Sequence, residues 1–373
     1  MKKDRLDILG QKIASVDRHF VHLLARRVRL AKEVAMIKIE DGSPLYRSQK
    51  EKERLDQVSK WAEEEGVNPE FARSLLYPVI GESCKNQMVI VDSLRLGNSS
   101  EKFNPTYEEL QANLIRLTES WAPKYDLEYD REHPATAALT KFEHGVIDRI
   151  ISQSCDGKYA LDLGCATGKE IRRLSKRFRK LQGFDISPAM VEFGLKGVAK
   201  EGLKNINLEV HDIESRFPVE DCSVSFLIMN NGTGSDVQNL SFVFSEIRRV
   251  LKPHGRFLIS FYNKEAWAQR TFFPWPLGLV AGIDQERNCL EVRLGNELIP
   301  IFAQPYTLSE IKGMIPDRLC VLESYTYPVL TSILPTEIIE SIKPVGTIQE
   351  LDDIIVQTET GLGAYIIVAG KKV

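Results

Sequence analysis

A short segment of small residues in this chain stands between a strand-like stretch and a helix-like stretch. Residues 158–163 are apolar enough for a buried strand, residues 164–168 read Gly-Cys-Ala-Thr-Gly, and residues 169–178 have the apolar spacing of a helix. A strand, a glycine turn and a helix open the nucleotide-binding α/β folds, because small residues let the backbone approach a ligand and the helix N-terminus offers free N–H groups. The turn residues expected to contact a cofactor are Gly164, Ala166 and Gly168.

Three acidic residues accompany this turn and the two strands predicted after it. Asp162 precedes the first glycine, Asp185 lies near the end of a strand predicted over 181–187, and Asp212 lies near the end of one predicted over 207–213. A carboxylate about twenty residues beyond the turn is where a ribose diol finds its acceptor. The third glycine of the dinucleotide fingerprint is missing, so the spacing departs from that motif. A glycine turn alone is often structural, but acids at three successive strand ends favour a cofactor site.

This combination of turn and acids resembles the class I S-adenosylmethionine (SAM)-dependent methyltransferases. The run Arg-Val-Leu-Lys-Pro-His-Gly-Arg before a strand at 256–262 is a further feature of that family. The resemblance implies a Rossmann-like α/β fold with SAM as cofactor. It also implies that Asp212 accepts from the adenine amino group while the backbone of Ile213 holds the ring. The residues assigned to SAM are Asp162, Gly164, Ala166, Gly168, Asp185, Ile186, Asp212, Ile213 and Asn230.

The composition of the chain is that of a globular protein with more than one domain. It has 373 residues, of which 43% are hydrophobic and 27% charged, and a net charge of −3. This charge indicates neither a nucleic-acid footprint nor a membrane-binding surface. No apolar run reaches transmembrane length, the N-terminus does not resemble a signal peptide, and the six cysteines are scattered. We therefore expect a cytoplasmic protein with reduced thiols and no metal site.

The first forty residues have the pattern of one long amphipathic helix. Apolar side chains recur every three or four residues from Leu6 to Ile37, which corresponds to a helix of about 50 Å at 1.5 Å per residue. That length exceeds the diameter of a small domain, so the apolar stripe is expected to pack against a second chain in a homodimer. Two more helices are predicted over 48–65 and from Pro69, behind the cap Asn68, to about Ile90.

This helical pattern resembles the all-helical chorismate mutases, which are intertwined dimers. The segments that carry the resemblance are 6–17, 23–27, 34–38, 50–51 and 83–87. It implies an all-α domain that rearranges chorismate to prephenate, a pericyclic step in which the enzyme holds a dianion folded and stabilises charge on the ether oxygen. The residues assigned to this site by position are Arg27, Lys38, Glu51, Gln87, Ser83 and Lys50.

The chain departs from that family at three positions. Gly10 stands where the family carries an arginine that reaches the partner's site, Lys50 replaces another arginine, and Arg47 replaces an aspartate of the mobile loop. A glycine supplies no charge, so mutase activity is expected to be weak. Two alternatives stay open: the helical domain serves dimerisation or metabolite sensing, or it eliminates pyruvate from isochorismate, as similar helical domains do.

These patterns divide the chain into domains. We expect a helical domain over 1–90, a linker over 91–105, and a methyltransferase domain over 106–373, in which 264–305 form a substrate lid. Ligands of open α/β sheets bind at the carboxyl ends of the strands. The residues that we assign to the methyl acceptor are Asn231, Tyr125, Tyr129, His144, Tyr262, Arg270 and Arg293.

The expected reaction is methyl transfer to a small molecule, in which the enzyme mainly positions the acceptor against an activated donor. A fused chain gains most when its parts share a metabolite, so the predicted acceptor is an aromatic or α-keto acid, such as an arylpyruvate, derived from chorismate or prephenate. Arg270 and Arg293 would bind its carboxylate, and His144 would act as the base for methylation at carbon.

Overall fold

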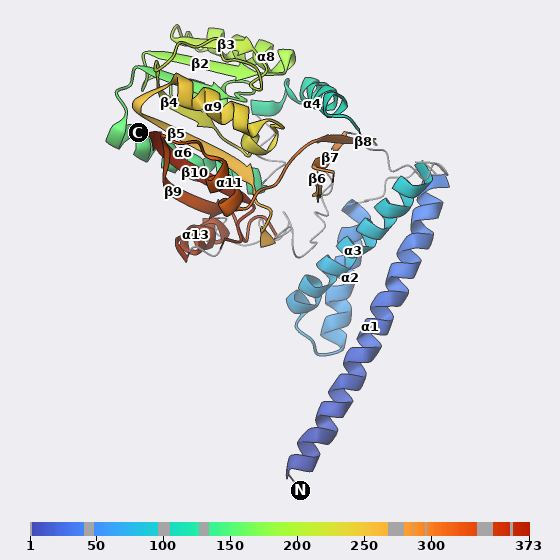
Figure 1. Ribbon diagram of the computed structural model, residues 1–373. Helices are drawn as coiled ribbons and strands as arrows, with labels where there is room; N and C mark the ends of the chain where they lie inside the picture. The colour runs from blue at the N-terminus through green and yellow to red at the C-terminus, as the bar shows by residue number, and fades with distance from the viewer. Residues whose placement is uncertain are drawn as a thin grey trace. The chain divides into compact units, whose positions relative to one another are not determined.

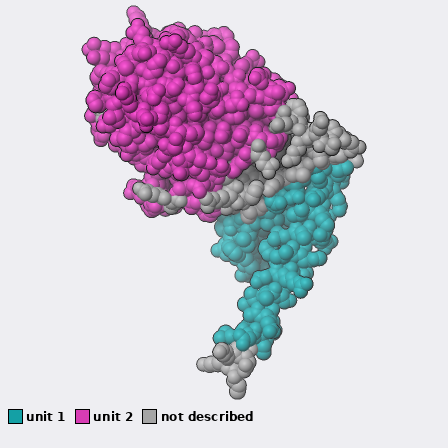
Figure 2. Space-filling model, viewed as in Figure 1, with its two compact units in different colours: residues 1–104, 272–278 teal, residues 105–271, 279–373 magenta. Residues whose placement is uncertain are grey.

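The computed structural model describes most of the chain and divides it into two compact units. The described residues are 2–40, 48–95, 105–126, 134–267, 280–285, 287–294, 297–333, 346–358 and 361–373. The described residues of one unit lie within 1–104, and those of the other lie within 105–373 (Figure 2).

The described part of the first unit is entirely helical, as predicted. Its helices are α1 (Lys2–Glu40), α2 (Ser48–Glu64) and α3 (Pro69–Arg95). Asn68 caps α3, because its Oδ1 accepts a hydrogen bond of 3.0 Å from Phe71 N. Helix α3 packs against both α1 and α2. It continues to Arg95, beyond the predicted start of the linker.

The two halves of α1 differ in their surroundings. Ala31 and Ala35 are buried where the C-terminal part of α1 packs against α3, whereas Leu6, Ile13 and Val16 are 70%, 62% and 67% exposed. Figure 1 shows the N-terminal part of α1 extending well past α2 and α3. The apolar stripe of this part is therefore uncovered by the described residues of its own unit.

The second unit is built on a mostly parallel sheet. In its described part seven strands lie in the order β3-β2-β1-β4-β5-β10-β9, with β1 to β5 parallel and β10 antiparallel to both of its neighbours. The strands are β1 (Tyr159–Leu163), β2 (Lys180–Asp185), β3 (Ile206–Val210), β4 (Val224–Met229), β5 (Leu251–Tyr262), β9 (Leu319–Tyr327) and β10 (Tyr365–Lys372). The order reverses between β1 and β4, which is where open α/β sheets bind their ligands. The predicted Rossmann-like fold is confirmed.

Helices cover both faces of this sheet (Figure 1). One hydrophobic core includes residues of α9 and α11, and the other includes residues of α6, α7 and α8. Strand β4 is buried along its whole length, as expected for a parallel strand between two helical layers. The helices of this unit are α4 (Tyr107–Trp121), α6 (Pro134–Ser154), α7 (Lys169–Arg173), α8 (Pro188–Lys200), α9 (Leu240–Val250), α11 (Leu308–Met314) and α13 (Gly346–Ile355), with short 3-10 turns η1 (Thr233–Ser235) and η2 (Val356–Thr358).

Helix α7 is shorter than the sequence pattern predicts. It ends at Arg173, whereas the apolar spacing continues to Phe178. The side chain of Asn205 donates hydrogen bonds of 2.8 Å to the carbonyls of Ser175 and Phe178. These bonds hold the chain in a turn, so tertiary contacts override the local helical preference.

A small second sheet lies within the segment predicted to be a lid. It consists, among the described residues, of β6 (Val280–Asp284), β7 (Cys289–Leu294) and β8 (Glu297–Phe302), with β7 paired antiparallel to both β6 and β8. Helix α4 packs against this sheet through the fully buried Leu117, and Asn113 Nδ2 donates to Pro300 O at 2.9 Å. A capping box formed by Thr106 and Glu109 starts this helix.

Candidate functional site

Three of the residues assigned to the mutase site lie together between α1 and α3. Lys38 Nζ donates a hydrogen bond of 2.9 Å to Gln87 Oε1, and the two residues are 7% and 6% exposed. Ser83 is also buried, one turn before Gln87, and donates to Val79 O at 2.8 Å. Burying an ammonium group and an amide is costly unless both are hydrogen-bonded, so this pair marks a polar site inside an otherwise apolar contact.

The other residues assigned to this site are placed less closely or lie outside the described residues. Arg27 is half-buried on α1, and Lys50 is exposed and forms an ion pair of 2.7 Å with Glu53. The side chain of Glu51 and the whole of Arg47 lie outside the described residues. At Gly10 on α1 an added Cβ would meet no described atom within 4 Å, so this position has room for a larger side chain.

The predicted cofactor turn joins β1 to α7. Gly164 and Gly168 have φ angles of +72° and +70°, and a Cβ on Gly164 would lie only 2.5 Å from Thr233 Cγ2. Glycine is therefore required at position 164 by both backbone conformation and space. Asp185, at the end of β2, accepts hydrogen bonds from Ala166 N at 2.8 Å and from Ser187 N at 2.9 Å. These bonds fix the Asp185 carboxylate beside the turn, and Ile186 follows it directly.

Asp162 is a buried acid beneath this turn. It is 1% exposed, and its Oδ1 has no hydrogen-bond partner within the described part of the chain. Burial, together with the carboxylates of Glu170, Asp185 and Glu143, raises the pKa of Asp162 well above its usual value. An orphaned buried carboxylate of this kind fits a cationic ligand, which would restore both a charge partner and a hydrogen bond.

The residues assigned to adenine lie in the turn after β3. Asp212 Oδ1 accepts a hydrogen bond of 2.9 Å from Glu214 N, and Ile213 packs against the hydrophobic core. The hydroxyl of Tyr107 on α4 donates to the carboxylate of Glu214. The start of α4 is thereby tied to the turn in which the adenine contact is expected.

Helix α4 and the residues after it are also attached to the cofactor turn. Asp126 accepts hydrogen bonds from Thr167 in the turn and from Arg172 on α7, while Thr118 donates to Ser187 Oγ at 2.8 Å. Tyr125 is half-buried next to Asp126, and Tyr129 lies outside the described residues. The segment before the Rossmann-like fold therefore contacts the turn through side chains of several elements.

A buried carboxylate of α6 fixes the turn that follows β4. Asn231 (φ +54°) donates its N–H to Glu143 at 3.2–3.3 Å, and its Oδ1 accepts from Thr140 Oγ1 at 2.9 Å. Gly232 N donates to Ser260 Oγ at 2.8 Å, and Ser260 in turn hydrogen-bonds Glu143. Glu143 is 0% exposed, and burial raises its pKa to about 8. The turn with Asn230 and Asn231 is thus held at the carboxyl edge by the side chains of Glu143, Thr140 and Ser260.

The remaining residues assigned to the methyl acceptor have different environments. His144 Nε2 lies 2.8 Å from the carboxylate of Glu170, which also binds Arg173. Tyr262, at the end of β5, lies with its ring 5.6 Å from that of Tyr365. Arg270 and the side chain of Arg293 lie outside the described residues.

Glu143, Asp126 and Asp236 belong to this region although the sequence analysis did not select them. Asp236 directly follows η1 and has a buried Oδ1 without a partner among the described residues. A signal for Glu143 exists, since it falls on the same helical face as the buried Leu139 and Ile147. An acid on an apolar stripe is a buried group that needs donors.

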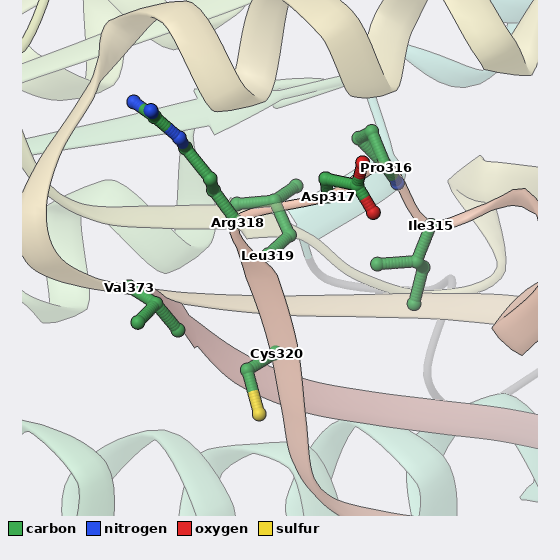
Figure 3. Close-up of a pocket in the computed structure, with 7 residues that line it drawn as sticks. All are labelled: Ile315, Pro316, Asp317, Arg318, Leu319, Cys320 and Val373. Atoms are coloured by element: carbon green, nitrogen blue, oxygen red, sulfur yellow. The ribbon is translucent and has the colours of Figure 1, made fainter.

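The structure also has a cavity away from these residues (Figure 3). Its volume is about 510 Å³, and it is lined by Ile315, Pro316, Asp317, Arg318, Leu319, Cys320 and Val373. It lies where β9 begins and β10 ends, which is the sheet edge opposite the cofactor turn.

Among the described residues, no helix combines the length and apolarity needed to cross a membrane, and no group of three or more His, Cys, Asp or Glu side chains is arranged to hold a metal ion.

Comparison with known proteins assigns each unit to a family. Residues 9–88 match the model of chorismate mutase type II, and residues 155–293 match that of a methyltransferase domain. The chain therefore joins a chorismate mutase type II domain to a methyltransferase domain, both from enzyme families. The methyltransferase domain takes S-adenosylmethionine as its cofactor, and the glycine turn, Asp185 and the orphaned Asp162 carboxylate fit this cation.

Individual relatives match part of the chain. A ubiquinone/menaquinone biosynthesis C-methyltransferase of Caulobacter vibrioides is 29% identical over 170 residues, which cover 43% of this chain and 65% of the relative. A T-protein of Enterobacter agglomerans is 37% identical over 78 residues, 21% of each chain. The PH0226 protein of Pyrococcus horikoshii is 15% identical with a TM-score of 0.46, covering 66% of this chain and 99% of that chain. The match to the Caulobacter protein, at 65% of its length, spans somewhat less than two thirds of that relative.

We expect Glu143→Gln to change how stability depends on pH. Because the pKa of Glu143 is raised to about 8 in the folded protein, the stability that this residue contributes is fully present below its ordinary pKa and is lost as pH rises from there toward 8. The stability of wild type relative to Glu143→Gln should fall by about 1.4 kcal/mol per pH unit in that window. Urea unfolding at about pH 5.5, 6.5 and 7.5 measures this difference. The exposed Glu192→Gln is the control, and equal pH slopes for wild type and Glu143→Gln would contradict the assignment.

Proposed function

We propose that this protein is a bifunctional enzyme that rearranges chorismate to prephenate in its helical unit and methylates a small molecule with SAM in its α/β unit. The observation that carries the second activity is the pair of carboxylates at the turn between β1 and α7. Asp185 is fixed by two backbone donors, while Asp162 is buried with an oxygen that has no partner among the described residues. The two groups suit the ribose and the cationic end of SAM.

In this proposal each residue at the carboxyl edge has a separate task. Asp185 would accept hydrogen bonds from the ribose hydroxyls, Asp162 would pair with the ammonium group, and Asp212 with the backbone of Ile213 would hold the adenine. Bound SAM supplies a methyl group that is already activated by the sulfonium. The chain itself then has to orient the acceptor and keep water out of the site.

We further propose that the acceptor is an aromatic or α-keto acid, such as an arylpyruvate, and that the methyl group goes to carbon. The name of the Caulobacter relative describes a C-methyltransferase, which supports carbon as the accepting atom. A metabolite shared between the fused units supports an acceptor derived from chorismate or prephenate. Arg270 and Arg293 remain our candidates for its carboxylate. Label transfer from SAM to arylpyruvates, but not to amines, would support this choice, whereas transfer confined to acceptors outside this class would exclude it.

For the helical unit the buried pair of Lys38 and Gln87 supports a site that binds the ether oxygen and a carboxylate of chorismate. Gly10 provides no positive charge, so we propose a slower rearrangement than in standalone mutases. The same residue favours the alternative that the unit mainly senses an aromatic metabolite or mediates dimerisation. Elimination of pyruvate from isochorismate is the third possibility, and product analysis separates it from the rearrangement.

We propose that two chains associate through α1. Its first half carries Leu6, Ile13, Val16 and Phe20, which are 50–70% exposed. A stripe of this kind along about four turns of helix is unfavourable in water, and a second copy of α1 presents a matching surface. The cytoplasm is the compartment that we propose for the assembly.

Replacing Asp185 should weaken the binding of SAM. Asp185→Ala removes the ribose acceptor and leaves buried donors unpaired, so we expect a loss of about 1–3 kcal/mol in affinity. Calorimetry on the full chain measures it, with the exposed Asp317→Ala as the control. Unchanged affinity in Asp185→Ala would exclude this placement of the cofactor.

The helical site is tested by two substitutions with opposite expected effects. Lys38→Ala should lower chorismate turnover by about two to three decades, since a charged donor in a closed site contributes about 2–4 kcal/mol. Gly10→Arg should raise turnover by supplying the missing charge. Absorbance assays of chorismate consumption measure both, with the exposed Lys60→Ala as control. If Lys38→Ala turned over chorismate at the wild-type rate, the site would lie elsewhere.

Dimerisation is tested with neighbouring positions on α1. Ile13→Glu places a charge in the apolar stripe and should yield monomers, whereas Lys12→Glu, on a polar position, should leave the dimer intact. Light scattering at micromolar concentration distinguishes the two states. A monomeric wild type would contradict the proposal directly.

A further inference from the structure

Asp236 lies in a rigid backbone segment at the carboxyl edge of the sheet. It follows η1, and its N–H donates to Thr233 O at 3.0 Å. Ser235 accepts from Tyr262 N at 2.8 Å through its hydroxyl and from Gln304 N at 2.8 Å through its carbonyl. A Cβ on Gly234 would lie 2.4 Å from Phe261 Cε1, so the segment packs tightly on β5. Contacts on several sides therefore fix the position of Asp236.

The same segment touches the cofactor turn. Thr233 is in contact with Gly164, since a Cβ at that glycine would lie 2.5 Å from Thr233 Cγ2. Asp236 itself interacts electrostatically with Asp185, the residue assigned to the ribose, and with Tyr365. Asp236 is thus near both the proposed SAM site and the tyrosines at the ends of β5 and β10.

The two carboxylate oxygens of Asp236 differ in their hydrogen bonds. Its side chain hydrogen-bonds Tyr262, whereas Oδ1 is buried and has no partner among the described residues. Burial raises the pKa of Asp236 to about 8. A carboxylate with such a pKa exchanges protons near neutral pH, which is the range in which a general base is most effective.

Three other titratable groups described at this edge already have partners for their polar atoms. Glu143 binds Asn231 N and Ser260, and both oxygens of Asp185 accept from backbone N–H groups. His144, the base favoured by the sequence, lies with Nε2 2.8 Å from the carboxylate of Glu170. Asp162 has an orphaned oxygen too, but it lies beneath the glycine turn, where the cationic end of SAM is proposed.

We infer that Asp236 is the general base of the methyl transfer, with Tyr262 as its positioning residue; this inference rests on the proposed C-methylation of an α-keto acid. Oδ1 of Asp236 takes the proton from the carbon beside the keto group, and the C–H electron pair becomes the enolate. That pair forms the bond to the methyl carbon, while the electrons of the broken S–C bond go to sulfur and give S-adenosylhomocysteine. The proton then leaves Asp236 for solvent.

The test uses the full chain with phenylpyruvate as acceptor and measures two steps. Transfer of label from SAM reports the complete reaction. Exchange of the C3 protons for deuterium in the presence of S-adenosylhomocysteine, above the spontaneous rate, reports proton removal alone. Asp236→Asn, of nearly equal shape, should keep SAM affinity within about threefold and lose about 10²–10⁴-fold in both rates. Asp317→Asn, the same change at the opposite edge, should match wild type in both.

The pH profile distinguishes a base from a residue that only supports the fold. The titratable groups acting on Asp236 are Asp185 from β2, Tyr262 from β5 and Tyr365 from β10. Since the hydrogen bond from Tyr262 lowers the pKa of Asp236, Tyr262→Phe should move the rise of the exchange rate to higher pH. A shift in that direction supports the inference, and an unchanged profile contradicts it.

The remaining outcomes separate the role of Asp236 as a base from the proposed methyl transfer. Wild-type rates of exchange and transfer in Asp236→Asn would overturn the base while leaving the methyltransferase proposal intact. Loss of SAM affinity in Asp236→Asn would overturn it as well, because the residue would then hold the cofactor. If wild type binds SAM but neither exchanges nor methylates phenylpyruvate or the other arylpyruvates, the proposed acceptor and this role of Asp236 are both excluded.

Discussion

The α/β unit depends on one electrostatic constraint, the burial of several carboxylates at the carboxyl edge of its sheet. Asp162, Glu143 and Asp236 all have pKa values raised by burial, and two of them have an oxygen without a partner among the described residues. Buried acids that lack a cation are unfavourable in an empty site. On this account SAM, a cation, provides the missing positive charge beside Asp162.

The architecture around this edge follows from the same requirement. Strand order reverses between β1 and β4, which opens the edge to a ligand. Glu143, on α6, fixes the turn that follows β4. Asp126 links the segment before the fold to the cofactor turn. The helical unit has a comparable feature in the buried contact of Lys38 with Gln87, where polar groups gather inside an apolar interface.

Much of this site follows from the sequence, because its elements are local. The strand, turn and helix around Gly164 and the acid Asp185 could be predicted from spacing, since the ends of adjacent parallel strands must meet at one edge. The apolar face of α6 signals that Glu143 is buried, but the partners of Glu143 and Asp126 could not be predicted, because they lie 88 and 41 residues away. The early end of α7 likewise depends on Asn205, which is distant in sequence and close in space.

The central claim is that SAM binds against these buried acids, and proton release on binding tests it most directly. Calorimetric titration of the full chain with SAM near pH 7, in two buffers with different ionisation enthalpies, measures the protons exchanged. Because a bound cation lowers the pKa of Asp162 from its raised value, the account predicts a net release of protons and therefore different apparent enthalpies in the two buffers. Binding with equal enthalpies in both buffers would contradict it.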